Sequence, residues 1–550
     1  MRFFLVLLSC YFLLPAAHAQ RGYEADTYEV LRTMWKAKND RTRKQALTLY
    51  DRAFVAYPDS VEEIGLYKAS VLAGQLGEIE KAFDYLERLV EISSTQADGW
   101  VHVAGEYSRS EYPNLLEDPR WTALEASQVA RREAFFQRLA AEEAEFLKPA
   151  TLQFSENPEA GIEAEFLPKA HRNYSIRYAL SDTLTTSYFV ALPEHYDPSR
   201  SYPMLVFLHG AVRFNAATLY QTERVLADWN RFYTKYAERD EVILVFPQAD
   251  SRYNWMTTDE GFDYVPGVIA QIKRSINVDD NRVFVSGHSN GATGSFNYWL
   301  RHPTPFAAFF GFNTYPKVFT GGTFLKNGNH RPFVSFSTDQ DYYYPPAAND
   351  SLIALTGRLG LSYEDHRYAG FPHWFPEFDE SEPAVARIFE QIKTTERNPY
   401  PTELFWQTDD LRDGRVDWLE ITQLDTTARA APWQRTENFP ITSWLSYNKR
   451  EQLVARSVEQ RAFDYPRAAG AVRAVYADNR FELQTSRVGE LAVYIAPAMV
   501  DLSQPVVIVV NGREVFSETV APDAAWMREE YARSGERTQV FCRRVLVEVR

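Results

Sequence analysis

A serine held between two glycines is the feature of this chain whose residue types and spacing best fit covalent chemistry. Gly287-His288-Ser289-Asn290-Gly291 has the Gly-x-Ser-x-Gly form of a nucleophile elbow, and the apolar run 282–286 comes directly before it. A serine on a tight strand-to-helix turn needs small neighbours, because a large side chain at either glycine would collide with nearby backbone. Five residues with three fixed positions also recur by chance. The surrounding elements must therefore decide whether Ser289 is a nucleophile.

The segments around Ser289 predict a sheet that is covered by helices. Strands are expected over residues 174–192 (a pair), 203–210, 242–247, 282–286, 307–312 and 332–337. Stretches long enough to be helices, such as 219–238 and 264–276, separate them. Continuous apolar strands that alternate with helices predict a parallel sheet covered on both faces, in the α/β class. Such a sheet places its chemistry at the carboxyl ends of the strands.

Three further motifs occur around the elbow in chain order. They are Leu208-His209-Gly210, Asp341-Tyr342-Tyr343-Tyr344-Pro345 and Gly370-Phe371-Pro372-His373-Trp374. With the elbow, they make residues 172–395 resemble an α/β-hydrolase esterase domain, closest to the polyhydroxybutyrate-depolymerase and feruloyl-esterase group of secreted enzymes. That family carries its acid in an Asp-x-x-apolar-Pro motif and its base in a Gly-x-x-His-x-aromatic loop. Both motifs follow the serine in the family's order.

The resemblance implies a catalytic triad of Ser289, His373 and Asp341. A serine hydroxyl is a poor nucleophile at neutral pH and needs an imidazole to take its proton, which is the role expected of His373. The imidazole needs a carboxylate to fix its tautomer and stabilise its positive charge. Asp339 remains an alternative acid because it lies nearer the end of its strand, but only Asp341 stands four residues before Pro345.

An oxyanion hole is expected from two backbone N–H groups. Asn290, directly after the nucleophile, should supply one, and Ala211 or Val212, after the His209-Gly210 motif, should supply the other. His209 is expected to anchor that loop, and His288 to be structural. Asn290 stands where the family more often has a hydrophobic residue or methionine, which bears on substrate preference.

Aromatic residues close to these motifs suggest a pocket that stacks on a sugar or phenolic ring. Tyr342 and Trp374 are the candidate substrate-binding residues, with Tyr343, Tyr344 and Trp255 as further possibilities, although aromatic residues are equally common in cores. The sequence thus predicts a carboxylic-ester hydrolase that acts on esterified polysaccharide or a related small-molecule ester through an acyl-enzyme. Triad chemistry needs only water, so neither a cofactor nor a metal is expected.

The amino terminus has the pattern of a secretory signal peptide over residues 1–19. A basic start is followed by a short apolar core and an Ala-x-Ala ending at Ala19. We therefore expect export to the periplasm or the medium and no membrane span after the signal is removed. Only Cys542 then remains, so no internal disulfide is expected. A formal charge of −15 without a dense basic stripe argues against a nucleic-acid partner.

Different patterns flank the central domain, which is expected to cover residues 149–396. Residues 20–148 form a helical region, in which segments 44–54 and 80–90 resemble tetratricopeptide helices at an offset of 36 residues. Such a region would bind a protein partner, and a plain helical domain is the alternative. Residues 397–550 are β-rich and predict a sandwich-like domain without an obvious active site, including a tight hairpin at Asn511-Gly512.

Two other functions remain open at this stage. One is a serine peptidase of the prolyl-oligopeptidase kind, which has the same fold and triad order but normally carries a propeller that the helical first region does not resemble. The other is a binding protein that uses its helical repeats and has lost catalysis. The missing propeller pattern argues against the peptidase, and the presence of Ser289, Asp341 and His373 in order argues against the binding protein.

Overall fold

The computed structural model describes residues 18–34, 39–154, 162–214, 216–464 and 467–549, and the predicted signal peptide lies outside them up to residue 17. The chain divides into two compact units, residues 1–142 and 143–550. Within the described residues, no helix has both the length and the apolar character needed to cross a membrane.

The first unit is built from helices. In chain order they are α1 (His18–Met34), α2 (Asp40–Ala56), α3 (Glu63–Gln75), α4 (Ile79–Ile92), α5 (Val101–Ala104), α6 (Ser108–Glu111) and the beginning of α7 (Pro119–Phe146). The two repeat-like segments of the sequence fall in α2 and α4, which are the second members of the hairpins α1/α2 and α3/α4. Ala46 and Ala82, small residues at equivalent places in these two helices, are fully buried in the unit's core.

An eight-stranded sheet forms the centre of the second unit. Its strands are β3 (Asn173–Ser181), β4 (Leu184–Ala191), β5 (Tyr202–Leu208), β6 (Ile243–Pro247), β7 (Val278–Gly287), β8 (Ala308–Phe312), β9 (Phe333–Gln340) and β10 (Tyr363–Pro372). Their order is β10-β9-β8-β7-β5-β6-β4-β3. Strands β5, β6, β7, β8, β9 and β10 run parallel to one another, and β4 is antiparallel to both β3 and β6. The prediction of a mostly parallel α/β sheet is confirmed.

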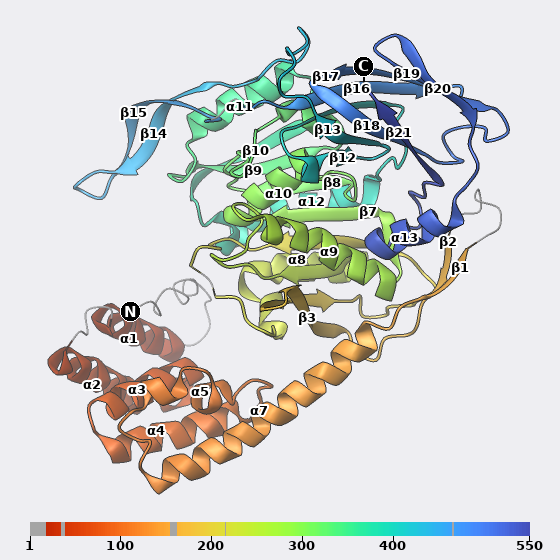
Figure 1. The fold of residues 1–550 in the computed structure, drawn as a ribbon. Helices are drawn as coiled ribbons and strands as arrows, with labels where there is room; N and C mark the ends of the chain where they lie inside the picture. The colour runs from red at the N-terminus through yellow and green to blue at the C-terminus, as the bar shows by residue number, and fades with distance from the viewer. Residues whose placement is uncertain (1–17, 35–38, 155–161, 215, 465–466, 550) are drawn as a thin grey trace. The chain divides into compact units, whose positions relative to one another are not determined.

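Helices cover both faces of this sheet (Figure 1). Residues of α9 (Asp259–Ser275), α10 (Asn290–Arg301) and α11 (Pro346–Arg358) share one hydrophobic cluster, and residues of α8 (Arg231–Asp240) and α12 (Glu382–Thr394) share another. Strand β5 divides its side chains between the two clusters: Met204 and Val206 face the first, while Leu205 and Phe207 face the second. This alternation is what a strand buried on both faces requires.

One expected helix is shorter than the sequence suggested. Helical structure over 219–238 was expected, but α8 begins only at Arg231, and two short 3-10 turns, η4 (Glu223–Leu226) and η5 (Asp228–Asn230), precede it. The indole of Trp229 lies against His288, with ring centroids 5.2 Å apart. The segment before α8 is therefore not part of that helix, and it places Trp229 beside His288.

The C-terminal region contains two larger sheets that share a core. The five-stranded sheet consists of β11 (Glu403–Thr408), β16 (Gly470–Ala477), β17 (Arg480–Ser486), β19 (Pro505–Val510) and β20 (Arg513–Thr519), and the four-stranded sheet of β12 (Arg415–Val416), β13 (Leu419–Leu424), β18 (Val488–Ile495) and β21 (Arg543–Glu548). Val472, Ile508 and Val493 from the two sheets belong to one buried cluster. The expected tight turn joins β19 to β20, with positive φ at both Asn511 (52°) and Gly512 (80°).

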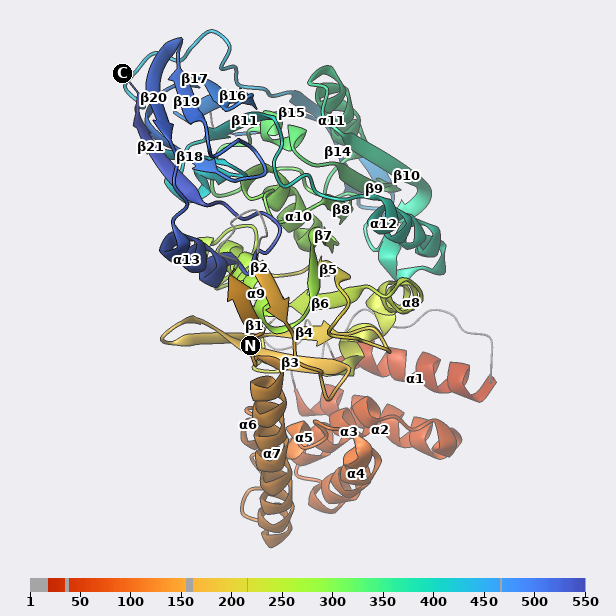
Figure 2. The same cartoon turned by 90° about the vertical axis from the view of Figure 1, so that its right-hand side faces the viewer.

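Two short hairpins complete the second unit, together with α13 (Ala524–Ser534). The first pairs β1 (Thr151–Phe154) with β2 (Ile162–Glu165). The second pairs β14 (Pro440–Tyr447) with β15 (Leu453–Arg461) and joins neither larger sheet. In both views this second hairpin lies beside α11 of the central domain (Figures 1 and 2). A segment that the sequence assigned to a separate β domain is therefore packed against the central one.

Candidate active site

The turn between β7 and α10 holds Ser289 in a backbone conformation that few non-glycine residues adopt. Its φ is 57° and its ψ is −118°. A Cβ at Gly287 would lie 2.4 Å from the carbonyl carbon of Gly291, and one at Gly291 would lie 1.8 Å from the carbonyl oxygen of Leu208. Both positions therefore require glycine, and the turn is the strained elbow that the motif predicts.

Ser289, His373 and Asp341 form a continuous hydrogen-bonded chain. His373 Nε2 lies 2.8 Å from Ser289 Oγ, and His373 Nδ1 lies 2.9 Å from Asp341 Oδ1. A carboxylate only accepts hydrogen bonds, so Nδ1 carries the proton and Nε2 accepts from the serine hydroxyl. His373 and Asp341 are buried, with 2% and 3% exposed, whereas Ser289 is partly open. The geometry is that of a nucleophile, a base and a group that orients the base.

Asp341 is held by several donors as well as by His373. The backbone N–H groups of Tyr343 and Tyr344 donate to its Oδ1 at 2.8 and 3.4 Å, and the side chain of Asn313 donates to its Oδ2 at 3.0 Å. Asn313 follows β8 and adopts a left-handed backbone conformation (φ 53°). No motif in the sequence marks it. These bonds fix the direction of the carboxylate.

Asp339, the alternative acid, lies at another point of the same strand end. Its Oδ1 accepts the backbone N–H of Gly370 at 2.8 Å, so it fastens the end of β10 that leads to His373. The structure thus brings Asp341, and not Asp339, into hydrogen-bonding contact with the imidazole.

The loop after β5 passes directly beside the elbow. A Cβ at Gly210 would lie 3.2 Å from Ser289 Cβ, and the next residue, Ala211, has a φ of 54°. The backbone N–H of Val212 donates to Asn290 Oδ1 at 3.2 Å. Because the backbone N–H of Val212 is used in that bond, the backbone N–H of Ala211 is the better of the two predicted donors for the oxyanion. Asn290 stands at the N-terminus of α10, where its own N–H has no partner within the helix.

His209 and His288 both act as neutral anchors. The Nδ1 of His209 bonds the carbonyl of Gly210 at 2.7 Å, and its Nε2 accepts from the N–H of Ala249 at 3.0 Å. The Nε2 of His288 donates to the carbonyl of His373 at 2.8 Å. Burial lowers the pKa of His209, and burial together with the neighbouring His373 lowers the pKa of His288 to about 3. We therefore expect neither imidazole to accept the proton of Ser289.

Aromatic rings gather near the triad, but not all of those expected from the sequence. Trp374 is 40% exposed, and its ring meets His373 edge-on at 5.1 Å. The ring of Tyr343, which is 46% exposed, lies 4.4 Å from that of His373, whereas the ring of Tyr342 lies 4.4 Å from that of Tyr343. Trp255 is fully buried and donates to the carbonyl of Asn290, so the suggestion that it stacks on substrate is wrong.

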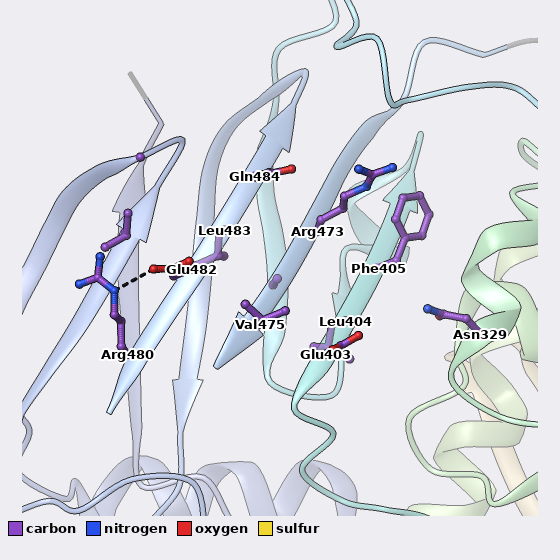
Figure 3. A pocket seen from close by; sticks show the side chains of 13 residues that line it. Asn329, Glu403, Leu404, Phe405, Arg473, Val475, Arg480, Glu482, Leu483 and Gln484 are labelled. Carbon is purple, nitrogen blue, oxygen red and sulfur yellow. Dashed lines mark hydrogen bonds and ion pairs between the residues drawn. The ribbon is translucent and has the colours of Figure 1, made fainter. Parts of the chain in front are cut away.

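A separate hollow of about 590 Å³ lies on the five-stranded sheet (Figure 3). Thirteen residues line it, among them Phe405, Arg473, Arg480 and Glu482, and the last two form an ion pair of 2.9 Å. None of the thirteen is a serine, a histidine or a cysteine. None of the three triad residues lines this hollow, so chemistry rather than volume locates the candidate active site.

Comparisons with known proteins found similarity to solved structures. No protein-family model matches the chain, and no curated protein matches it in sequence. Solved structures with a similar fold include a thermostable esterase (21% identity, 41% of this chain and 64% of the esterase, TM-score 0.35) and the fluorophosphonate-binding serine hydrolase FphF of Staphylococcus aureus (18%, 40% and 98%, 0.31). A third is LpqC, a poly(3-hydroxybutyrate) depolymerase of Bordetella parapertussis (17%, 40% and 89%, 0.31). This chain thus spans less than two thirds of the first of these proteins. At such values the functional argument depends on the geometry of the site.

The described residues contain no group of three or more His, Cys, Asp or Glu side chains placed to hold a metal ion.

Proposed function

We propose that this protein is a serine carboxylic-ester hydrolase that works through Ser289, His373 and Asp341. The observation that carries the proposal is the hydrogen-bonded chain from Ser289 Oγ through both nitrogens of His373 to Asp341, on a strained elbow. A structural serine needs neither a buried imidazole in contact with its hydroxyl nor a left-handed backbone conformation. Both features cost free energy and fit a nucleophile.

The reaction would proceed through a covalent acyl-enzyme. Ser289 Oγ attacks the carbonyl carbon of the ester while His373 Nε2 takes the hydroxyl proton. The alcohol leaves with that proton, and water, deprotonated by the same imidazole, then releases the acid and restores Ser289. The N–H groups of Asn290 and Ala211 would bind the oxyanion in both steps, at about 3 kcal/mol for each donor. These steps need water and no cofactor.

The proposed substrate is an esterified polysaccharide or a related ester. Trp374 and Tyr343, both partly exposed and in contact with His373, offer ring surfaces at the point where the leaving alcohol would lie. The signal-peptide pattern of residues 1–19 supports an exported enzyme that meets its substrate in the periplasm or the medium.

Labelling with a fluorophosphonate probe tests the nucleophile. We expect one equivalent of label at Ser289 in the full-length exported chain and none in Ser289→Ala, with kcat on p-nitrophenyl acetate lower by about a millionfold in that variant. Release of acetate or ferulate from esterified xylan would support the substrate class. Cleavage of peptide amides without cleavage of any ester would instead identify a peptidase, and absence of labelling would favour a binding protein.

Export has its own test. Expression of the full gene product with a C-terminal tag, followed by N-terminal sequencing of the exported protein, should give a chain that begins at Gln20. A chain that keeps Met1 and stays in the cytoplasm would contradict export without affecting the catalytic proposal.

A further inference from the structure

Two exposed aromatic side chains of the second unit are in contact with His373. Among the described residues of this unit, the large aromatic side chains that are exposed are Phe214 (62%), Tyr447 (51%), Tyr343 (46%) and Trp374 (40%). Phe214 lies in the loop after His209-Gly210, Tyr343 follows Asp341 by two residues, and Trp374 follows His373. Single exposed hydrophobic side chains need no explanation when they are scattered, but Trp374, Tyr343 and Tyr447 belong to one set of ring contacts.

Four of the rings near the triad form a continuous row. The centroid of Trp374 lies 6.0 Å from that of Tyr343, Tyr343 lies 4.4 Å from Tyr342, and Tyr342 lies 5.4 Å from Tyr447. We call Trp374, Tyr343, Tyr342 and Tyr447 the ring row. It begins in contact with His373 and ends on the β14–β15 hairpin of the C-terminal region.

The hairpin is fastened where it meets the row. Trp444 Nε1 donates to the carbonyl of Tyr342 at 3.1 Å, and the indole packs near Tyr344 and Tyr315, each at 6.3 Å. An isolated two-stranded hairpin is only marginally stable in water, so these contacts fix the position of its exposed face. Most of β15 is open to solvent, whereas most of β14 is half-buried or buried. A loop that merely joined two strands of the C-terminal sheets would need neither the anchor nor the exposed Tyr447.

We propose that the ring row is an extended binding surface for a neutral polysaccharide chain and that the β14–β15 hairpin supplies its outer subsite through Tyr447. This inference rests on the proposed function, because it takes the ester bond to lie at Ser289. Sugars present apolar C–H faces bordered by hydroxyl groups. Each ring of the row likewise combines an apolar face with an O–H or N–H group at its edge.

Two observations favour a neutral sugar chain over other polymers. The formal charge of −15 disfavours a polyanion at long range. An aliphatic polyester, the other chemistry that an exposed apolar surface would take, offers only acceptors along its chain, whereas sugar hydroxyl groups can both donate to and accept from the phenol groups of the row. The ring contacts also lead from His373 to the β14–β15 hairpin, as expected of a surface for a chain that extends away from one reacting ester.

The test compares the length dependence of hydrolysis in the wild type and in Tyr447→Ala. Substrates are acetylated xylo-disaccharide and xylo-hexasaccharide, and the readout is the ratio of kcat/KM on the hexasaccharide to that on the disaccharide. One ring contact predicts that this ratio falls by about fivefold to tenfold in Tyr447→Ala, through a higher KM for the longer substrate. Tyr447→Phe should keep most of the ratio. Leu546→Ala, which removes a similarly exposed side chain on β21, should leave the ratio unchanged.

A binding measurement separates this inference from the proposed function. Calorimetry with unesterified xylohexaose on Ser289→Ala, with and without Tyr447→Ala, reports the ring row without any chemistry. Weaker binding in the double variant supports the row even if no ester is ever cleaved. Ester cleavage with an unchanged ratio in Tyr447→Ala overturns the row and leaves the hydrolase intact. A Tyr447-dependent length effect on 3-hydroxybutyrate oligomers, and none on the sugars, also overturns it, in favour of a polyester.

Discussion

Asn290 Oδ1 accepts the backbone N–H of Val212 at 3.2 Å, so the residue directly after Ser289 also holds the loop that follows β5. Its backbone N–H is one proposed donor to the oxyanion, and its side chain positions the segment that supplies the other, at Ala211. The amide at this place is the departure from the family's usual hydrophobic residue. In the structure it ties together the two halves of the proposed oxyanion hole, which is a role the sequence did not suggest.

Replacing this amide should therefore slow the chemistry. In Asn290→Ala we expect kcat on p-nitrophenyl acetate to fall by about tenfold, because the loop that carries Ala211 loses its anchor and one oxyanion donor is less well placed. KM should change little and the melting temperature by a few degrees at most, since one hydrogen bond contributes about 1 kcal/mol. An unchanged kcat would show that the loop keeps its position without Asn290.

Two neighbouring aspartates, one at the end of β9 and one directly after it, should differ sharply in their effect on catalysis. Asp341→Asn removes the charge that orients and stabilises the imidazole of His373, and we expect kcat to fall by about 10⁴-fold. Asp339→Asn still accepts the N–H of Gly370 through its amide oxygen, so a loss below about tenfold is expected. Steady-state kinetics of both variants, with circular dichroism to verify folding, make the comparison. The reverse order of effects would assign the acid to Asp339.

The sequence alone was sufficient to predict the elements whose conformation depends on residues close together in the chain. The elbow could be predicted because a serine on a tight strand-to-helix turn needs a glycine on either side. The buried strands could be predicted because a sheet covered on both faces needs continuous apolar runs. The hairpin at Asn511-Gly512 followed from the positive φ that its turn requires at both residues.

The residues that the sequence missed reach the site from distant parts of the chain. Asn313 contacts Asp341 only because β8 and β9 are neighbours in the sheet. Trp229 and Tyr447 lie in an irregular segment and in a separate hairpin, and no short motif contains them. Such contacts depend on tertiary packing, which overrides local pattern. Trp255 shows the converse, because an aromatic residue close to the motifs in sequence is part of the core.

A buried charge cluster joins the C-terminal region to the central domain, and its loss should destabilise the second unit. Glu536 pairs with Lys273 and with Arg397 (2.7 Å), and both cations are fully buried. Burial alone would raise the pKa of Glu536, but Arg397 and Lys273 lower it to about 2. Glu536→Gln leaves two buried cations with less compensation, so we expect the free energy of unfolding to fall by about 3 to 5 kcal/mol in urea denaturation.

An exposed pair provides the control for this cluster. Glu482 bonds Arg480 at 2.9 Å on the surface of β17, where both side chains are about half exposed. Because water screens such a pair, Glu482→Gln should change the free energy of unfolding by less than about 1 kcal/mol. Equal changes in the free energy of unfolding for the two substitutions would show that burial does not make the Glu536 cluster contribute more to stability than an exposed pair.

The stability of the second unit should decrease as the pH falls below neutrality, in part because of His302. This side chain follows α10, and burial together with the arginines at 533, 415 and 301 lowers its pKa to about 4. The unfolded chain binds a proton near pH 6.5, while the folded chain resists it until about pH 4. Stability that is fully present above pH 6.5 is therefore lost as the pH falls towards 4, by on the order of 2 kcal/mol between pH 7 and pH 5.

Comparing the wild type with His302→Gln isolates this contribution. Asp413, which bonds Arg301, has a pKa raised by burial to about 6, so it takes up a proton in the folded state first and opposes the trend between pH 6 and 4. Because Asp413 is present in both proteins, the difference between their unfolding free energies at pH 7 and pH 5 reports His302 alone. We expect the wild type to lose about 2 kcal/mol more than the variant over this range, and His195→Gln, at an exposed histidine, to behave as the wild type. Parallel pH profiles for all three proteins would mean that His302 titrates alike in the folded and unfolded chain, and that the three arginines do not oppose its protonation.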